Sequence, residues 1–132
     1  MKRNLLITVL FLCLTLVYPQ NVNQKYFETP LQYDNVEIKP LFPGGISEFM
    51  RYVISNYKVP EEDEEGYGVQ GVLEANILID VDGSVAQVNI TKDVAAAGKQ
   101  IKKIVSKCPK WQPGKNKGNY VPVIYNFTVT IK

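Results

Sequence analysis

The chain has 132 residues, of which 45% are hydrophobic and 21% are charged. This is the length and composition of one globular domain, and it excludes an intrinsically disordered chain. The sequence contains no histidine, so no imidazole can act as a catalytic base or a metal ligand.

The first 20 residues have the pattern of a secretory signal peptide. A basic start is followed by an apolar run from Leu5 to Val17, which is too short to cross a bilayer core comfortably. Pro19 stands where a small residue is expected at a cleavage site, so an uncleaved N-terminal anchor is the alternative. Cleavage would leave 13 basic and 13 acidic residues, and a neutral domain has no long-range attraction for nucleic acid or anionic lipid. It would also leave Cys108 without a disulfide partner.

The charges are unevenly distributed along the remaining sequence. Residues 21–93 carry 13 acids and five bases, whereas the chain from Val94 onward has eight lysines and no acid. This asymmetry could orient a partner, or it could lie on opposite faces of one small fold. The run "EEDEE" at residues 61–65 is interpreted as a solvated loop, with a cation site as the alternative.

Residues 21–40 are polar and lack periodicity, and we expect a short extended lead-in. After the glycine turn "FPGG", apolar residues recur at helical spacing from Ile46 to Tyr57, which predicts a helix of about three turns that ends before Pro60.

The next segment, "VLEANILIDVDGSVAQVNIT", predicts a β-hairpin with a two-residue turn at Asp82 and Gly83. That register places apolar pairs on one face, and these are Ile79–Ala86, Ile77–Val88 and Ala75–Ile90. The opposite face is mostly polar, with the pairs Asp80–Val85, Leu78–Gln87, Asn76–Asn89 and Glu74–Thr91. We therefore expect a sheet covered on one side only.

A second helical pattern runs from Ala97 to Cys108 and stops at Pro109. The closing segment, from Val121 to Ile131, alternates as a strand, and Pro122 near its start is typical of an edge. The predicted fold is α+β, a small two-layer sandwich of an antiparallel three-stranded sheet and two helices in the order α-β-β-α-β.

The sequence carries no recognisable catalytic or cofactor motif. "DVDGS" resembles the start of a calcium loop, but the twelfth position is Thr91 rather than the required glutamate. "PGG" and "PGKNKG" do not fit phosphate-binding spacings, and "NIT" and "NFT" match glycosylation acceptors at strand positions. We expect no enzymatic activity, no metal, no cofactor and no small-molecule substrate.

The ordered segments "FPGGISEFMRYVISNYKVP", "VQGVLEANILIDVDGSVAQVNI" and "CPKWQPGKNKGNYVPVIYNFTVTI" resemble the C-terminal domain of the TonB family, in the version found in energy transducers of the Bacteroidetes type. The resemblance covers about residues 41–132. It implies a periplasmic or secreted domain that binds an extended peptide of outer-membrane receptors, the TonB box, by adding it as a strand to the sheet. The sequence departs from an energy transducer because it has no histidine and no long proline-rich spacer.

Two groups of residues follow from this hypothesis. The expected partner-binding group is the closing strand and the basic turn before it, and its members are Lys115, Lys117, Val121, Val123, Ile124, Tyr125, Asn126 and Phe127. The expected structural group comprises Phe42, Gly44, Gly45, Asp82, Gly83 and Trp111. Trp111 is interpreted as a core residue at the helix–sheet junction, with ligand contact as the alternative. The alternative function is a stand-alone envelope module that self-associates through the same strand.

Overall fold

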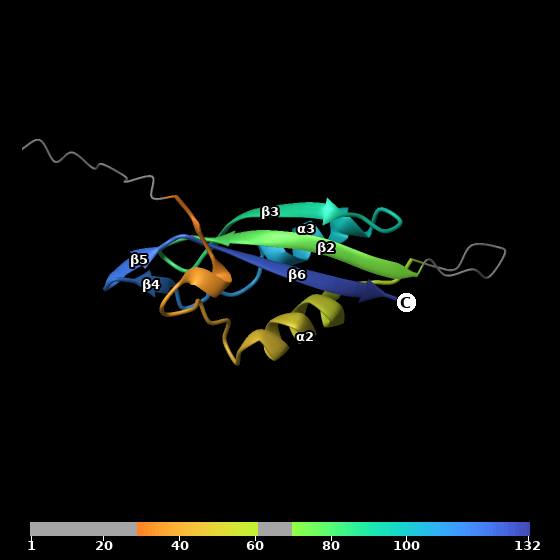
Figure 1. Cartoon of the computed structure of the whole chain (residues 1–132). Coiled ribbons are helices and arrows are strands. Elements are labelled where there is room, and N and C mark those ends of the chain that lie inside the picture. Colours follow the sequence, from red (N-terminus) through yellow and green to blue (C-terminus); the bar gives the residue numbers. More distant parts are fainter. Residues whose placement is uncertain (1–28, 61–69) are drawn as a thin grey trace, which may run out of the picture.

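The computed structural model describes residues 29–60 and 70–132. The expected signal peptide and the acidic run at residues 61–65 lie outside the described residues. The described residues form two helices, a long twisted sheet and a separate small ribbon, whose arrangement can be followed in Figure 1. In chain order the elements are β1 (Leu31–Gln32), the 3-10 turn η1 (Tyr33–Asn35), α2 (Ile46–Asn56), β2 (Gly71–Ile79), β3 (Val85–Lys92), α3 (Ala97–Ser106), β4 (Gly114–Asn116), β5 (Asn119–Val121) and β6 (Val123–Ile131).

The main sheet has four strands in the order β1-β6-β2-β3, and β4 pairs with β5 in a separate ribbon. The α+β class is confirmed, but the expected three-stranded sheet is wrong in two respects. The short β1 adds a fourth strand, parallel to the start of β6. The residues before Pro122 form β5 rather than the beginning of the closing strand, because Pro122 has no N–H to continue a ladder.

The predicted β2–β3 hairpin is present, and its central register is confirmed. Ile77 pairs with Val88, and Asn76 pairs with Asn89. Both ends are shifted by irregularities, so that Ile79 pairs with Val85 and Glu74 pairs with Lys92. The predicted partners at these ends are therefore wrong. At the Ile79 end the connection is a five-residue loop, residues 80–84, rather than a two-residue turn, and at the Glu74 end a separate irregularity lies between Glu74 and Ala75. The loop is closed by the Asp80 N–H, which donates to the Ser84 carbonyl at 2.8 Å.

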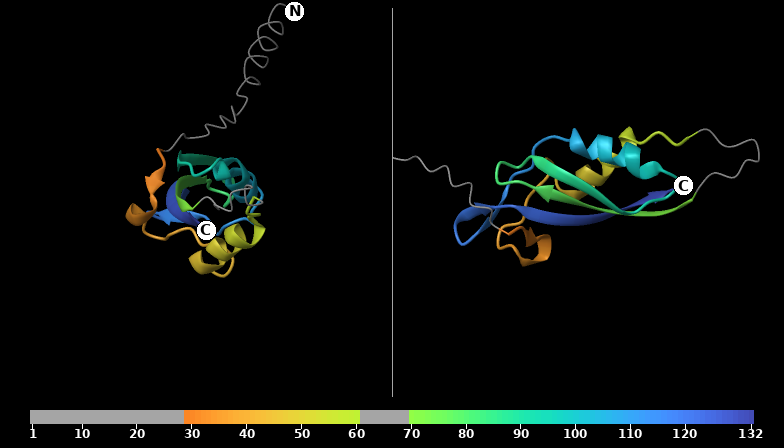
Figure 2. Two further views of the ribbon diagram at one scale, coloured as in Figure 1. Left: turned by 90° about the vertical axis from the view of Figure 1, so that its right-hand side faces the viewer. Right: turned by 90° about the horizontal axis from the view of Figure 1, so that it is seen from above.

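Both helices lie on one face of the sheet, and no helix of residues 29–60 and 70–132 covers the other face, called the uncovered face below (Figure 2). The apolar stripe of α2 buries Phe49 and Val53, and that of α3 buries Ile101 and Val105, all at 0% exposure. Burying side chains of this size contributes about 1.5–3 kcal/mol each. The apolar face of β2, from Leu73 to Ile79, packs beneath them, as the period-two pattern of the sequence predicts.

The described part of the lead-in belongs to the folded unit. Val36 is only 3% exposed and packs with Val121 and Val123 in a small second core. Farther along, Ile38 bridges to Lys115, and Leu41 bridges to Gln112, each through backbone hydrogen bonds. Residues 29–42 thus connect the ribbon and the start of β6 to the rest of the domain through backbone hydrogen bonds and the small second core.

Candidate functional site

The candidate site is the outer flank of β6, which we define as the edge of this strand that faces away from β2. On its inner side β6 pairs with β2 along its whole length, from Val123–Ile79 to Ile131–Gly71. On its outer side β1 pairs only with Val123 and Ile124. The edge expected to be open is therefore shorter than Val121–Ile131, because the protein's own lead-in covers its beginning.

The direction of the backbone groups identifies which residues stay open. The Leu31 N–H donates to the Pro122 carbonyl at 3.0 Å, so this carbonyl points away from β2, toward the outer flank. Backbone groups of every second residue in a strand point to the same side, which places those of Asn126, Thr128 and Thr130 on the outer flank. Within residues 29–60 and 70–132, no strand pairs with β6 beyond Ile124 on this side.

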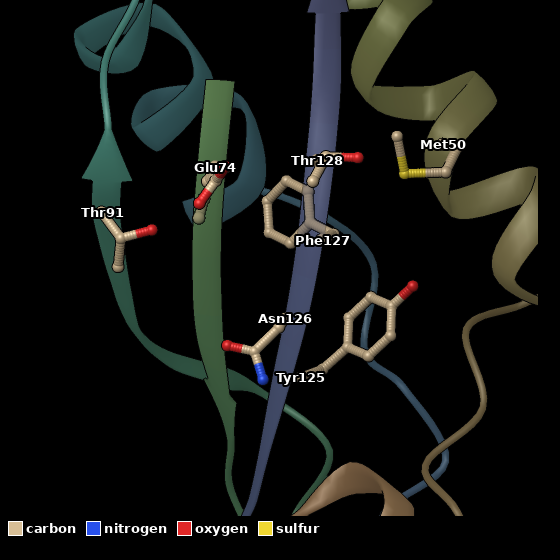
Figure 3. A pocket seen from close by; sticks show the side chains of 8 residues that line it. Met50, Glu74, Thr91, Tyr125, Asn126, Phe127 and Thr128 are labelled. Carbon is tan, nitrogen blue, oxygen red and sulfur yellow. The ribbon is translucent and has the colours of Figure 1, made fainter. Parts of the chain in front are cut away.

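A hollow of about 560 Å³ extends from α2 across β6 and β2 to Thr91 of β3. Figure 3 shows that α2 runs alongside β6 at this edge and that Met50 projects toward the strand. The hollow is lined by Met50 of α2, Glu74 and Ala75 of β2, Thr91 of β3, and Tyr125, Asn126, Phe127 and Thr128 of β6. At its α2 end the hollow adjoins the open backbone groups of the outer flank.

The hollow has two chemically different sides. Tyr125 and Phe127 pack with the Phe49 ring on the helix side, at centroid distances of 6.1 and 5.3 Å. Burial raises the pKa of the Tyr125 phenol, and the neighbouring Tyr33 raises it further, so Tyr125 is a neutral hydroxyl at physiological pH. On the uncovered face, Asn126 Nδ2 donates to Gln32 Oε1 at 3.3 Å, and Glu74 is the one charged residue among the eight that line the hollow.

A row of carboxamides crosses the uncovered face next to the hollow. Gln87 Nε2 donates to Asn89 Oδ1 at 3.0 Å, and Asn89 Nδ2 donates to Asn76 Oδ1 at 3.0 Å. Asn76 is the register partner of Asn126 on β6. These amides thus satisfy one another along β3 and across to β2 without a covering layer.

The structure divides the expected partner-binding residues into three groups. Tyr125, Asn126 and Phe127 line the hollow, whereas Val123 and Ile124 are already paired with β1. Lys115 and Val121 belong to the β4–β5 ribbon at the other end of β6 (Figure 1), and Lys117 lies in the turn of that ribbon, where its N–H donates to Glu37 Oε2 at 3.2 Å. The Lys115 ammonium sits 4.6 Å from the centre of the Tyr120 ring. The basic turn is not brought to the hollow.

Trp111 lies in the core rather than on a binding surface. It is 2% exposed and contacts the rings of Phe42, Phe49 and Tyr125 at centroid distances of 5.0–5.8 Å. Its indole N–H is buried without a hydrogen-bond partner in the described part of the chain. Burial also raises the pKa of the adjacent Cys108 thiol, while the nearby indole acts weakly in the opposite direction.

The backbone of Trp111 anchors the tip of the hairpin. Its N–H donates to the Gly83 carbonyl at 2.8 Å, and Gly83 has a φ of +85°. The Asp82 carboxylate accepts hydrogen bonds from the Ser84 N–H and hydroxyl, at 2.9 and 2.6 Å, and these bonds lower its pKa. The remaining expected structural residues form the entry to α2, where Phe42 is buried and Gly44 and Gly45 have φ angles of +86° and +93°.

Sequence reasoning missed six contributors to the hollow or its edge, namely Met50, Glu74, Ala75, Thr91, Thr128 and Thr130. The alternation of the closing segment already placed Thr128 and Thr130 on the face opposite Phe127, so the signal for these two was present. Nothing in the sequence indicated that Met50 and Glu74 would meet β6, because that depends on how α2 and β2 are placed beside it.

No group of three or more Asp, Glu, Cys or His side chains that could hold a metal occurs in the described ranges. Neither helix found there is long and apolar enough to cross a membrane. Comparison with known protein families, with curated proteins and with solved structures finds no match for this chain.

Proposed function

We propose that this protein is a TonB C-terminal-like domain that binds extended polypeptide segments by adding them as a strand to the outer flank of β6. The observation that carries the proposal is the juxtaposition of three residues with outward-facing backbone groups and an adjoining hollow of about 560 Å³. Unpaired N–H and C=O groups at a sheet edge are the usual template for strand addition.

The proposed partner is a segment of an outer-membrane receptor, of the TonB-box type, or of another envelope protein. This assignment rests on the sequence resemblance to TonB domains and places the protein in the periplasm, in transport or as an accessory to it. Each of Asn126, Thr128 and Thr130 offers one donor and one acceptor. At about 1 kcal/mol net each, these six hydrogen bonds do little more than offset the cost of association. Apolar side chains of the peptide that enter the hollow must therefore supply most of the affinity, and a weak dissociation constant, between roughly 10 µM and 1 mM, is expected.

Peptide titration followed by NMR tests the proposal directly. TonB-box peptides should shift the amide signals of Asn126, Thr128 and Thr130. The variant Thr128→Pro removes one outward N–H without removing a bond to β2, so it should abolish binding, while Thr128→Val keeps the N–H and should bind nearly normally. No binding at millimolar peptide, or equal binding by both variants, would refute the proposal.

Self-association through the same flank is the competing use of this edge. Light scattering separates the two, because a stable dimer that Thr128→Pro dissociates would indicate that β6 pairs with a second copy. Mass spectrometry of the periplasmic form tests the proposed localisation. A chain that retains its first 20 residues would favour an inner-membrane anchor instead.

A further inference from the structure

We propose that the strand bound at the outer flank of β6 is amphipathic, with apolar side chains facing α2 and uncharged polar or basic side chains facing the uncovered face of the sheet. The inference rests on the proposed strand addition and specifies its partner. Glu74 then acts as a specificity residue that disfavours an acidic side chain opposite Thr128.

The helix side of the hollow calls for apolar residues. Successive side chains of an added strand point to opposite faces of the sheet, so every second one meets the space beside Met50, Tyr125 and Phe127. Met50 is half-buried, and its unbranched thioether adapts to side chains of different shape. A charged group placed here would lose its water without gaining an ion pair.

The other side of the hollow calls for polar or basic residues. There the added strand lies next to Asn126 and Thr128, and Thr128 is the register partner of Glu74. The Glu74 side chain is exposed, and among the described residues it forms no salt bridge, although Lys92 is its register partner on β3. A long basic side chain opposite Thr128 can extend across that threonine toward the carboxylate, whereas an acidic one meets like charge.

The direction of the lead-in favours a partner chain over the protein's own N-terminal segment as the occupant of this flank. The lead-in enters β1 parallel to β6, with Leu31 opposite Val123 and Gln32 opposite Ile124. Thr29 and Pro30 thus approach from the ribbon end of β6, away from Thr128. The chain then turns into η1, where the Tyr33 ring packs 4.9 Å from that of Tyr125.

The test uses the full chain and a set of seven-residue peptides that differ at one position. All carry valine at the helix-facing positions, and the central open-face residue is lysine, serine or glutamate. We expect the glutamate peptide to bind about two- to fivefold more weakly than the serine peptide, and the lysine peptide to bind best. Replacing the helix-facing valines by serine should weaken binding about tenfold.

Protein variants assign the preference to the proposed residue. Glu74→Gln should remove the difference between the lysine and glutamate peptides, and Glu74→Lys should reverse it. Glu48→Gln is the matched control, because it makes the same charge change at a carboxylate that lies outside the hollow and pairs with Arg51 at 3.1 Å; it should leave the preference intact.

The outcomes separate this inference from the proposed function. All peptides could bind with amide shifts at Asn126 and Thr128 but show no charge preference, or show a preference that the Glu74 variants do not change. Either result overturns this inference and leaves strand addition standing. If no peptide binds at millimolar concentration, or if a dimer occupies the flank, both fail. Preference for lysine that depends on Glu74 supports both.

Discussion

The substitution Gly83→Ala tests how the hairpin tip is anchored to the Trp111 segment. A Cβ atom at Gly83 would lie 1.8 Å from the Trp111 carbonyl oxygen, a distance that no side chain can occupy. Either the tip or the Trp111 backbone must move, and the hydrogen bond between the Trp111 N–H and the Gly83 carbonyl is then lost.

The magnitude follows from three contributions. Holding alanine at a φ of +85° costs about 1 kcal/mol. The lost hydrogen bond costs about 1 kcal/mol, and relieving the overlap costs about 1–3 kcal/mol. The free energy of unfolding should therefore fall by roughly 3–5 kcal/mol, which is a large part of the stability of a domain this size.

Gly118→Ala is the matched control, since Gly118 has a φ of +78° but nothing within 4 Å of the added Cβ. It should cost only about 1 kcal/mol. Thermal unfolding followed by the fluorescence of the single tryptophan should place the Tm of Gly83→Ala roughly 8–16 °C below that of Gly118→Ala. Equal Tm values for the two variants would show that the tip is not seated against Trp111.

Three further results are expected. Val36→Ala should lower the free energy of unfolding by about 1.5–3 kcal/mol in urea titrations, because Val36 is 3% exposed. Ile38→Ala is the control, since that side chain is 58% exposed, and it should change the free energy of unfolding by less than about 0.5 kcal/mol. Equal effects of the two substitutions would mean that the lead-in is not part of the core. Burial raises the folded-state pKa of Cys108 and Tyr125, so the unfolded chain releases these protons at lower pH than the folded one. The free energy of unfolding should therefore be unchanged below about pH 8.5 and decline as the pH rises through about 10. If the urea midpoint of Cys108→Ala falls with pH as steeply as that of the unsubstituted protein, the thiol does not contribute to this decline. The Cys108 thiol should also react with a disulfide reagent far more slowly in the native protein than in urea, and equal rates would contradict its burial.

Much of the fold could be predicted because its signals are local. The stripe from Ile46 onward, the β2–β3 alternation and the Ala97–Cys108 pattern each bury one face, and each formed the predicted element. β1 could not be predicted, since its two residues, Leu31 and Gln32, have no period of their own. They form a strand only because β6 offers an edge, which is a property of the tertiary structure.

The candidate site was predicted only in part for the same reason. The alternation of residues 121–131 indicated an edge strand, and Tyr125, Asn126 and Phe127 do line the hollow. The sequence could not show that Pro122 separates β5 from β6, nor that the basic turn with Lys115 would lie at the far end of the strand. Their proximity in sequence suggested that residues 115–127 form one binding surface. In the structure, β1 covers the start of β6, and the basic turn belongs to the separate β4–β5 ribbon.

Amide hydrogen exchange at β6 tests the central claim most directly. In the free protein, the outward-facing N–H groups of Asn126, Thr128 and Thr130 should exchange quickly, while those of Tyr125, Phe127 and Val129, which face β2, should be protected. A saturating extended peptide should protect the first three and leave the others as they were. Protection of Asn126, Thr128 and Thr130 in the free monomer, or no change when the peptide is bound, would contradict the account.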